Sequence, residues 1–175
     1  HQRSTSVIGP AGPIVYPACS KDMNFEPEVA VVMGRIAKNV TVENAMDYVL
    51  GFTCVNDVTL RDLQGIDPTW TRAQGFDTSC PLGPWIVMRD DLDWKDAKIS
   101  FTLNGEDVPM ASGTTANLIH GIPEQIAAIS SFSTLLPGDV IMTGTPNASG
   151  HLDPGDETIV HVEGIGDLRN VIVRA

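Results

Sequence analysis

The sequence has few cysteines and histidines, and their spacing excludes several common kinds of site. Its three cysteines, Cys19, Cys54 and Cys80, are widely separated and form no CxxC or CxxH arrangement, which favours reduced cytosolic thiols. The four histidines form no HExxH or HxH motif, so a zinc site is not expected. Cys54 lies in an apolar run and is expected to be a small core residue, because a nucleophilic role would require a neighbouring histidine.

Positive charge is also scarce. Lys and Arg number 11 against 22 Asp and Glu, which gives a formal net charge of −11 and a pI near 4.5. Such a chain would repel a nucleic acid or an anionic membrane surface. No apolar run reaches the length of a membrane span, and no charged-then-apolar leader opens the sequence. We therefore expect a cytoplasmic protein with no nucleic-acid or membrane partner.

The length of 175 residues suits one domain with a substantial core, and no linker, internal repeat or low-complexity segment divides it. We therefore expect a single domain over residues 1–175. The chain begins His-Gln-Arg with no methionine, which suggests that an N-terminal portion has been processed, truncated or omitted.

Hydrophobic patterning predicts a mainly β chain with a few short helices, an α+β protein built on a mixed sheet. Strands are predicted at about residues 13–17, 28–36, 52–58, 85–88, 98–103, 140–143, 158–162 and 167–173. Asn104-Gly105 predicts a β-hairpin that leads into Val108 and Met110.

Two helices and one long loop complete the prediction. One helix is expected from an N-cap at Thr41 to Gly51, and another from about Pro123 to Phe132. Residues 64–84 are rich in Gly, Pro, Asp and Thr and have no clear period, so they are expected to form a loop that carries function.

Three acidic residues lie where two predicted strands begin or end. Glu26 and Glu28 are two residues apart at the head of one apolar run, so they share one face of a strand, and Asp57 follows the next apolar run. Three converging carboxylates would repel one another unless a divalent cation lay between them, and oxygen ligands favour Mg²⁺, Mn²⁺ or Ca²⁺ over zinc. The alternative is that the two glutamates lie on a solvated outer face, the usual position for such a pair.

Five ordered blocks extend through the chain. They are FEPEVAVVMG (25–34), VNDVTLRDLQ (55–64), GFDTSCPLGPW (75–85), LLPGDVIMTGTP (135–146) and EGIGDLRN (163–170). Together they strongly resemble the fumarylacetoacetate hydrolase family, over nearly the whole chain from about Val7 onward. The resemblance implies a mixed β-roll or sandwich, a catalytic domain and a homodimer.

The resemblance also implies a site and a chemistry. It assigns Glu26, Glu28 and Asp57 to a Mg²⁺ or Mn²⁺ ion, and it implies small 2-oxo acids as substrates, including acylpyruvates, oxaloacetate and the dienedioates of aromatic catabolism. A metal-bound 2-oxo group is an electron sink, so an enolate can develop during hydrolysis or decarboxylation of the adjacent carbon–carbon bond. The alternative, an isomerase of 2-hydroxy-diene dioates, uses the same enolate.

Three further positions resemble substrate-binding residues of the family. Arg61 is a candidate partner for a substrate carboxylate, or else pairs with Asp62 or a neighbour in a structural turn. Gln64 resembles a glutamine that contacts substrate. Thr145 resembles the threonine that hydrogen-bonds the substrate carboxylate, and its alternative role is that of a turn residue.

Two departures from the family leave the proton chemistry unassigned. Gln74 is a further candidate for substrate binding, close to metal and substrate, where members usually have a lysine, and a neutral amide cannot stabilise a developing anion as a cation would. The family's upstream lid segment with histidine and glutamate is missing from this sequence, and His120 and His151 are general-base candidates only by elimination. A weakly active or inactive metal-binding member is therefore a third hypothesis.

Overall fold

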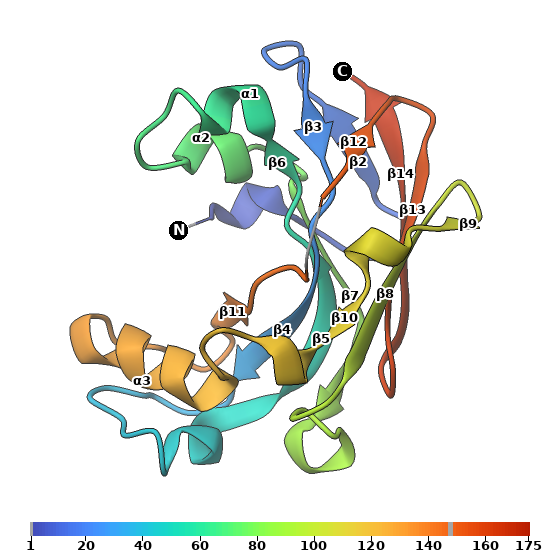
Figure 1. The fold of residues 1–175 in the computed structure, drawn as a ribbon. Helices are drawn as coiled ribbons and strands as arrows, with labels where there is room; N and C mark the ends of the chain where they lie inside the picture. Colours follow the sequence, from blue (N-terminus) through green and yellow to red (C-terminus); the bar gives the residue numbers. More distant parts are fainter. Residues whose placement is uncertain (1, 147–148) are drawn as a thin grey trace.

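The computed structural model describes residues 2–146 and 149–175, which form three β-sheets and a few short helices (Figure 1). The first sheet has the order β1 (Val7–Ile8), β7 (Cys80–Met88), β5 (Val49–Asn56), β4 (Pro27–Met33) and β11 (Val140–Met142). The second has the order β10 (Gly113–Thr114), β8 (Lys98–Leu103), β13 (Glu157–Val162), β14 (Gly166–Arg174) and β2 (Pro13–Tyr16), with β9 (Glu106–Asp107) paired to β8. The third is β12 (His151–Leu152), β3 (Met23–Asn24) and β6 (Thr59–Leu60).

The strand pairing is mixed, as the sequence predicts. β1 runs parallel to β7 and β14 runs parallel to β2, whereas the other pairs of strands are antiparallel. The α-helices are α1 (Arg61–Gln64), α2 (Thr71–Gln74) and α3 (Ile122–Phe132). Single 3₁₀ turns occur at Ser4–Ser6, Ala45–Tyr48, Arg89–Asp91, Pro109–Ala111 and Thr115–Asn117. No helix in the described part of the chain has both the length and the apolar character needed to cross a membrane.

The core fills the space between the two large sheets. All seven residues of β4 are buried, so this strand is covered on both faces. Phe25, just before β4, stacks on Phe101 of β8 with ring centroids 4.1 Å apart and joins the first sheet to the second. This packing fixes the beginning of β4, where two of the acidic residues lie.

The predicted mainly β fold is confirmed, as are the hairpin and the second helix. Asn104 and Gly105 both have positive φ angles, 53° and 82°, which suits the tight turn between β8 and β9. The hairpin is shorter than predicted because β9 ends at Asp107 and Met110 lies in a 3₁₀ turn. The helix at 122–132 begins one residue before its predicted start.

The predicted helix from Thr41 to Gly51 is wrong. Only Ala45–Tyr48 forms a 3₁₀ turn, and the residue at its N-cap position is Asn44, not Thr41. Val49 already belongs to β5, where it pairs with Met33. The pairing of β5 with β4 therefore decides the structure of this segment, although the spacing of its apolar residues favours a helix.

The prediction of one long loop at residues 64–84 is also partly wrong. The segment contains α2, and β7 begins at Cys80 instead of Trp85. The partners of the first residues of β7 lie far away in the chain, with Cys80 opposite Val7 and Leu82 opposite Val55. Local composition carries no information about such pairs, and Gly and Pro in the segment concealed the strand.

We predict that Asn170→Leu lowers the free energy of unfolding by about 1–3 kcal/mol, because a buried side chain would leave backbone acceptors without a donor. Asn170 is buried in β14, and its Nδ2 donates to the Gly9 carbonyl at 3.1 Å and to the Gly12 carbonyl at 2.9 Å. Urea denaturation measures the change. The exposed Asn117→Leu is the matched control, and an equal loss in both variants would contradict this account.

Candidate metal centre

The three acidic residues lie where β4 begins and β5 ends. Because the strands are antiparallel with Pro27 opposite Asn56, Glu26 just before β4 comes close to Asp57 just after β5. Two hydrogen bonds fix this meeting point: the Asp57 N–H donates to the Glu26 carbonyl at 2.9 Å, and the Glu26 N–H donates to Asn56 Oδ1 at 2.8 Å. Glu28, two residues along, points toward the same space.

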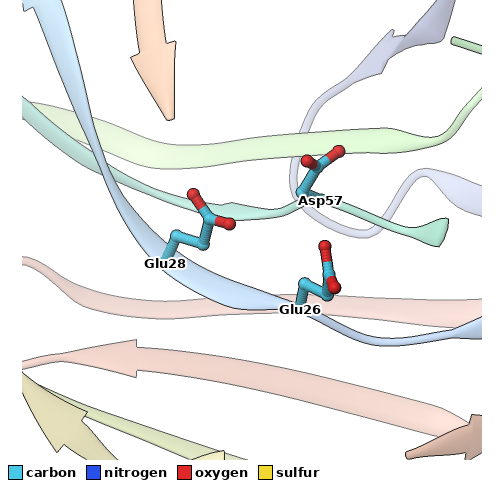
Figure 2. Close-up of side chains that lie close together, drawn as sticks. All are labelled: Glu26, Glu28 and Asp57. Carbon is cyan, nitrogen blue, oxygen red and sulfur yellow. The ribbon is translucent and has the colours of Figure 1, made fainter. Parts of the chain in front are cut away.

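The three carboxylates converge in space. Each offers one oxygen, and these oxygens all lie within 4.8 Å of one another. Figure 2 shows the side chains of Glu26, Glu28 and Asp57 pointing into one common space from the two strands. Their residues are only 8%, 4% and 7% exposed, so the alternative of a solvated outer face does not hold.

Burial makes this cluster costly in the absence of a cation. Burial, followed by the negative charge of Asp57, raises the pKa of Glu28 from 4.5 to about 8, although the Gly144 N–H bonded to it lowers this pKa. Burial, followed by the charge of Glu26, raises the pKa of Asp57 from 3.8 to about 7, partly offset by Gln2. Both shifts arise first from burial and then from a neighbouring carboxylate, so a cation bound between the carboxylates would lower both pKa values.

The donor set fits a hard divalent cation. The cluster offers carboxylate oxygens, the ligands that Mg²⁺, Mn²⁺ and Ca²⁺ prefer. Burial and the charges of Asp57 and Glu28 raise the pKa of the Cys80 thiol to about 12, so this nearby sulfur stays protonated and is a poor ligand. Cys54 is buried as expected, and burial raises its pKa to about 12, which argues against a nucleophilic role.

Arg61 and Gln64 flank Glu26 as one unit. Arg61 forms an ion pair with Glu26 and donates to Gln64 Oε1 at 2.6 Å. Asp62, the neighbour considered from the sequence, instead accepts from Ser20 Oγ at 2.6 Å. Among the described residues, Arg61 is the only arginine whose guanidinium contacts the carboxylate cluster.

Asp57 is held by two glutamines. Gln74, at the end of α2, donates its amide to Asp57 Oδ2 at 3.0 Å, so it lies at the cluster as expected from the sequence. Gln2 donates to Asp57 Oδ1 at 2.6 Å, and sequence reasoning missed this residue. No local pattern distinguishes Gln2, which reaches the site only because β1 pairs with the distant β7.

A cavity of about 490 Å³ adjoins Glu28. The Gly144 N–H donates to Glu28 Oε2 at 2.8 Å, and Gly144 and Thr145 both line this cavity. Thr145 Oγ1 is buried and has no hydrogen-bond partner among the described residues, so its hydrogen-bonding capacity is unused in this structure. Its other lining residues are Ile99, Thr114, Asn117, Leu118, Ile119, His120, Gln125, Thr143 and Pro146.

The described histidines do not contact the carboxylates. His151 bonds to Asp22 at 3.1 Å, and this hydrogen bond raises the pKa of the imidazole. His161 bonds to Asp167 at 2.6 Å, and the exposed His120 lines the cavity. His1 lies outside the described residues. A general base therefore has no assignment among the histidines that the structure describes.

A buried acidic centre at the meeting of two strands, within a mixed β-fold, defines the class of protein. The profile described as "Fumarylacetoacetate (FAA) hydrolase C-terminal" matches residues 1–173, so the chain belongs to the fumarylacetoacetate hydrolase family. This membership confirms the resemblance derived from the five sequence blocks.

Relatives and solved structures extend the comparison. Protein Rv2993c of Mycobacterium tuberculosis is 45% identical over 174 residues, which are 98% of this chain but only 64% of that protein. The mitochondrial oxaloacetate tautomerase Fahd2a of Rattus norvegicus is 38% identical over 179 residues, which cover 97% of this chain and 56% of that protein. The chain thus spans only about half to two thirds of the length of these relatives.

Two crystal structures share the fold. That of 2-hydroxyhepta-2,4-diene-1,7-dioate isomerase from Mycobacterium marinum has a TM-score of 0.94 and 43% identity, covering 99% of this chain and 67% of that one. That of fumarylpyruvate hydrolase from Pseudomonas aeruginosa, in complex with Mn²⁺ and pyruvate, has a TM-score of 0.92 and 27% identity, covering 99% and 77% of the two chains.

We predict that the metal-free protein loses stability as the pH rises from about 4 to about 8. The pKa values of Glu28 and Asp57 rise on folding, from 4.5 to about 8 and from 3.8 to about 7, so the folded state binds more protons than the unfolded chain in this window. Glu28→Gln should raise the free energy of unfolding at pH 8 by about 1 kcal/mol or more. Urea denaturation in a chelator, repeated across this pH range, measures both effects.

The exposed Glu106→Gln is the control for this experiment and should leave the pH profile unchanged. A flat profile for the unaltered protein, or a loss of stability in Glu28→Gln at pH 8, would show that the carboxylates do not repel one another.

Proposed function

We propose that this chain is the catalytic part of a divalent-metal-dependent enzyme that acts on small 2-oxo acids and their enols. The observation that carries the proposal is the cluster of three buried carboxylates, compensated by Arg61 alone among the described cationic side chains. Buried carboxylates of this kind are stable in their charged form only when a cation lies between them. Mg²⁺ or Mn²⁺ fits this donor set, and Ca²⁺ is a further candidate.

The residues around the cluster suit a small anionic substrate with several oxygens. Thr145 lines the cavity beside Glu28, and its hydroxyl, which has no partner among the described residues, would bond a carboxylate or keto oxygen of the substrate. Arg61 provides donors on the other side of the cluster, next to Glu26, and Gln64 Oε1 accepts a hydrogen bond that holds this guanidinium. The bound cation would act as a Lewis acid that stabilises negative charge developing on the 2-oxo oxygen.

Isomerisation of a 2-oxo acid through its enol is the reaction that we favour. Two relatives carry the names oxaloacetate tautomerase and 2-hydroxyhepta-2,4-diene-1,7-dioate isomerase, at 38% and 43% identity. Such a reaction only moves a proton between carbon and oxygen, whereas hydrolysis also requires an activated water. None of the described histidines contacts the cluster to activate one.

Hydrolysis or decarboxylation of the adjacent carbon–carbon bond is the second candidate. It is supported by the Pseudomonas aeruginosa fumarylpyruvate hydrolase, which shares the fold at 27% identity. The neutral Gln74 beside Asp57 instead favours a weakly active member. The assembly that we propose is the homodimer implied by the resemblance to the family.

We predict metal-dependent turnover of the substrates in a three-member panel: enol-oxaloacetate, a 2-hydroxymuconate-type dienedioate and an acylpyruvate. With Mn²⁺, the first two should be converted faster than the third is cleaved, as ultraviolet absorbance of the enol, the diene and the diketone will show. Asp57→Asn and Glu28→Gln should each lower kcat/KM at least 100-fold, equivalent to about 2.7 kcal/mol.

The hairpin strand β9 offers matched controls, because Glu106→Gln and Asp107→Asn make the same chemical changes on exposed side chains. Both should retain activity. Faster cleavage of the acylpyruvate would favour the hydrolase, and turnover that survives both Asp57→Asn and a chelator would contradict the proposed metal centre.

A further inference from the structure

The two carboxylate oxygens of Asp57 are each occupied by one neutral amide. Gln2 Nε2 lies 2.6 Å from Oδ1, and Gln74 Nε2 lies 3.0 Å from Oδ2. The two glutamines come from segments far apart in the sequence, the N-terminal segment before Ser4 and the end of α2 (Figure 1). Asp57 is thus held from two sides, although it follows β5 in an irregular segment.

Both glutamines make further contacts, and Gln74 Nε2 also donates to Thr59 Oγ1 at 3.3 Å. Gln2 Oε1 lies 3.3 Å from the Oγ of the fully buried Ser6, whose hydroxyl donates to the Arg3 carbonyl at the shorter distance of 2.6 Å. On the other side, the Gln74 backbone carbonyl accepts from Ser79 Oγ at 2.6 Å, and Ser79 is also fully buried. Side chains held in this way orient a ligand without having to be ordered when it binds.

The remaining carboxylates are compensated differently. Glu26 is paired with the cation of Arg61, and Glu28 accepts the backbone N–H of Gly144. Among the described residues, the side chains that donate to Asp57 are the uncharged amides of Gln2 and Gln74. Three carboxylates and one guanidinium leave the ionised cluster with a formal charge of −2, which one divalent cation would balance.

We infer that Gln2 and Gln74 are positioning residues for Asp57. Because both side chains are uncharged, the centre binds a divalent cation more tightly, and an anionic substrate less tightly, than it would with a cationic side chain in either place. The inference rests on the proposed metal centre and gives Gln74 a role other than substrate contact. Amides orient both oxygens of Asp57 and leave its full negative charge available. A cationic side chain in either place would hold the same oxygens but would repel the metal and attract an anionic substrate.

The inference predicts opposite changes in two affinities. Gln74→Lys and Gln2→Lys should each weaken Mn²⁺ binding at least tenfold, because a positive charge then lies within a few ångströms of the ion. Each should also tighten the binding of oxalate, a dianionic mimic of a 2-oxo acid, to the Mn²⁺-loaded protein by several-fold. Isothermal titration calorimetry measures both affinities without any need for turnover.

A variant that removes the hydrogen bond from Gln74 to Asp57 without changing the charge separates the effect of positioning Asp57 from the effect of charge on Mn²⁺ binding. Gln74→Met keeps the length of the side chain and should weaken Mn²⁺ binding about 10–100-fold. It should not tighten oxalate binding. A purely structural role would instead lower the stability of the metal-free protein and leave the Mn²⁺ affinity of the folded fraction unchanged.

Thr71→Lys is the matched control for charge. Thr71 is exposed on the same short helix as Gln74, so its variant adds a positive charge without contacting Asp57. Mn²⁺ and oxalate affinities should stay within twofold of those of the unaltered chain. Thermal unfolding in a chelator serves as the folding check, and both Gln→Lys variants should be at least as stable as the unaltered chain because added positive charge relieves repulsion.

Failure of this inference is distinguishable from failure of the proposed function. If the unaltered protein binds no Mn²⁺, the metal centre itself is wrong. If it binds Mn²⁺ and the Gln74 and Gln2 variants bind it equally well, only the positioning role is wrong. A Gln→Lys variant that loses affinity for both Mn²⁺ and oxalate, or that is destabilised in the chelator, would also overturn the inference.

Discussion

Mutual repulsion between three buried carboxylates is the constraint on which the site depends. Glu26, Glu28 and Asp57 lie with ligand oxygens within 4.8 Å of one another, in a region where water cannot screen their charges. Burial, followed by this repulsion, raises the pKa values of Glu28 and Asp57. The arrangement lowers the stability of the metal-free protein, but it provides the ligands for a divalent cation. The site is therefore a place where a requirement of function reduces stability.

The fold maintains this unfavourable arrangement with structure that is independent of the carboxylates. The antiparallel register of β4 and β5 places the beginning of one strand against the end of the other. The stack of Phe25 on Phe101 ties this end of β4 to the second sheet. Since these contacts do not change when the carboxylates gain or lose protons, the centre is preorganised for a cation and needs little rearrangement to receive it.

The mainly β fold and the three acidic residues could be predicted from the sequence, whereas features that depend on pairing between distant strands could not. The period of a strand put Glu26 and Glu28 on one face, and the apolar run before Asp57 put that residue at a strand end. Gln2 and Gly144 could not be found in this way, because they reach the site through the pairing of β1 with β7 and of β11 with β4. The predicted helix at 41–51 failed for the same reason, since Val49 pairs with the distant Met33.

Anomalous diffraction from crystals soaked in Mn²⁺ tests the central claim most directly. The account predicts a peak between the three carboxylates, about 2.0–2.6 Å from one oxygen each of Glu26, Glu28 and Asp57. The absence of a peak there at saturating Mn²⁺, or a peak found only elsewhere on the protein, would contradict it.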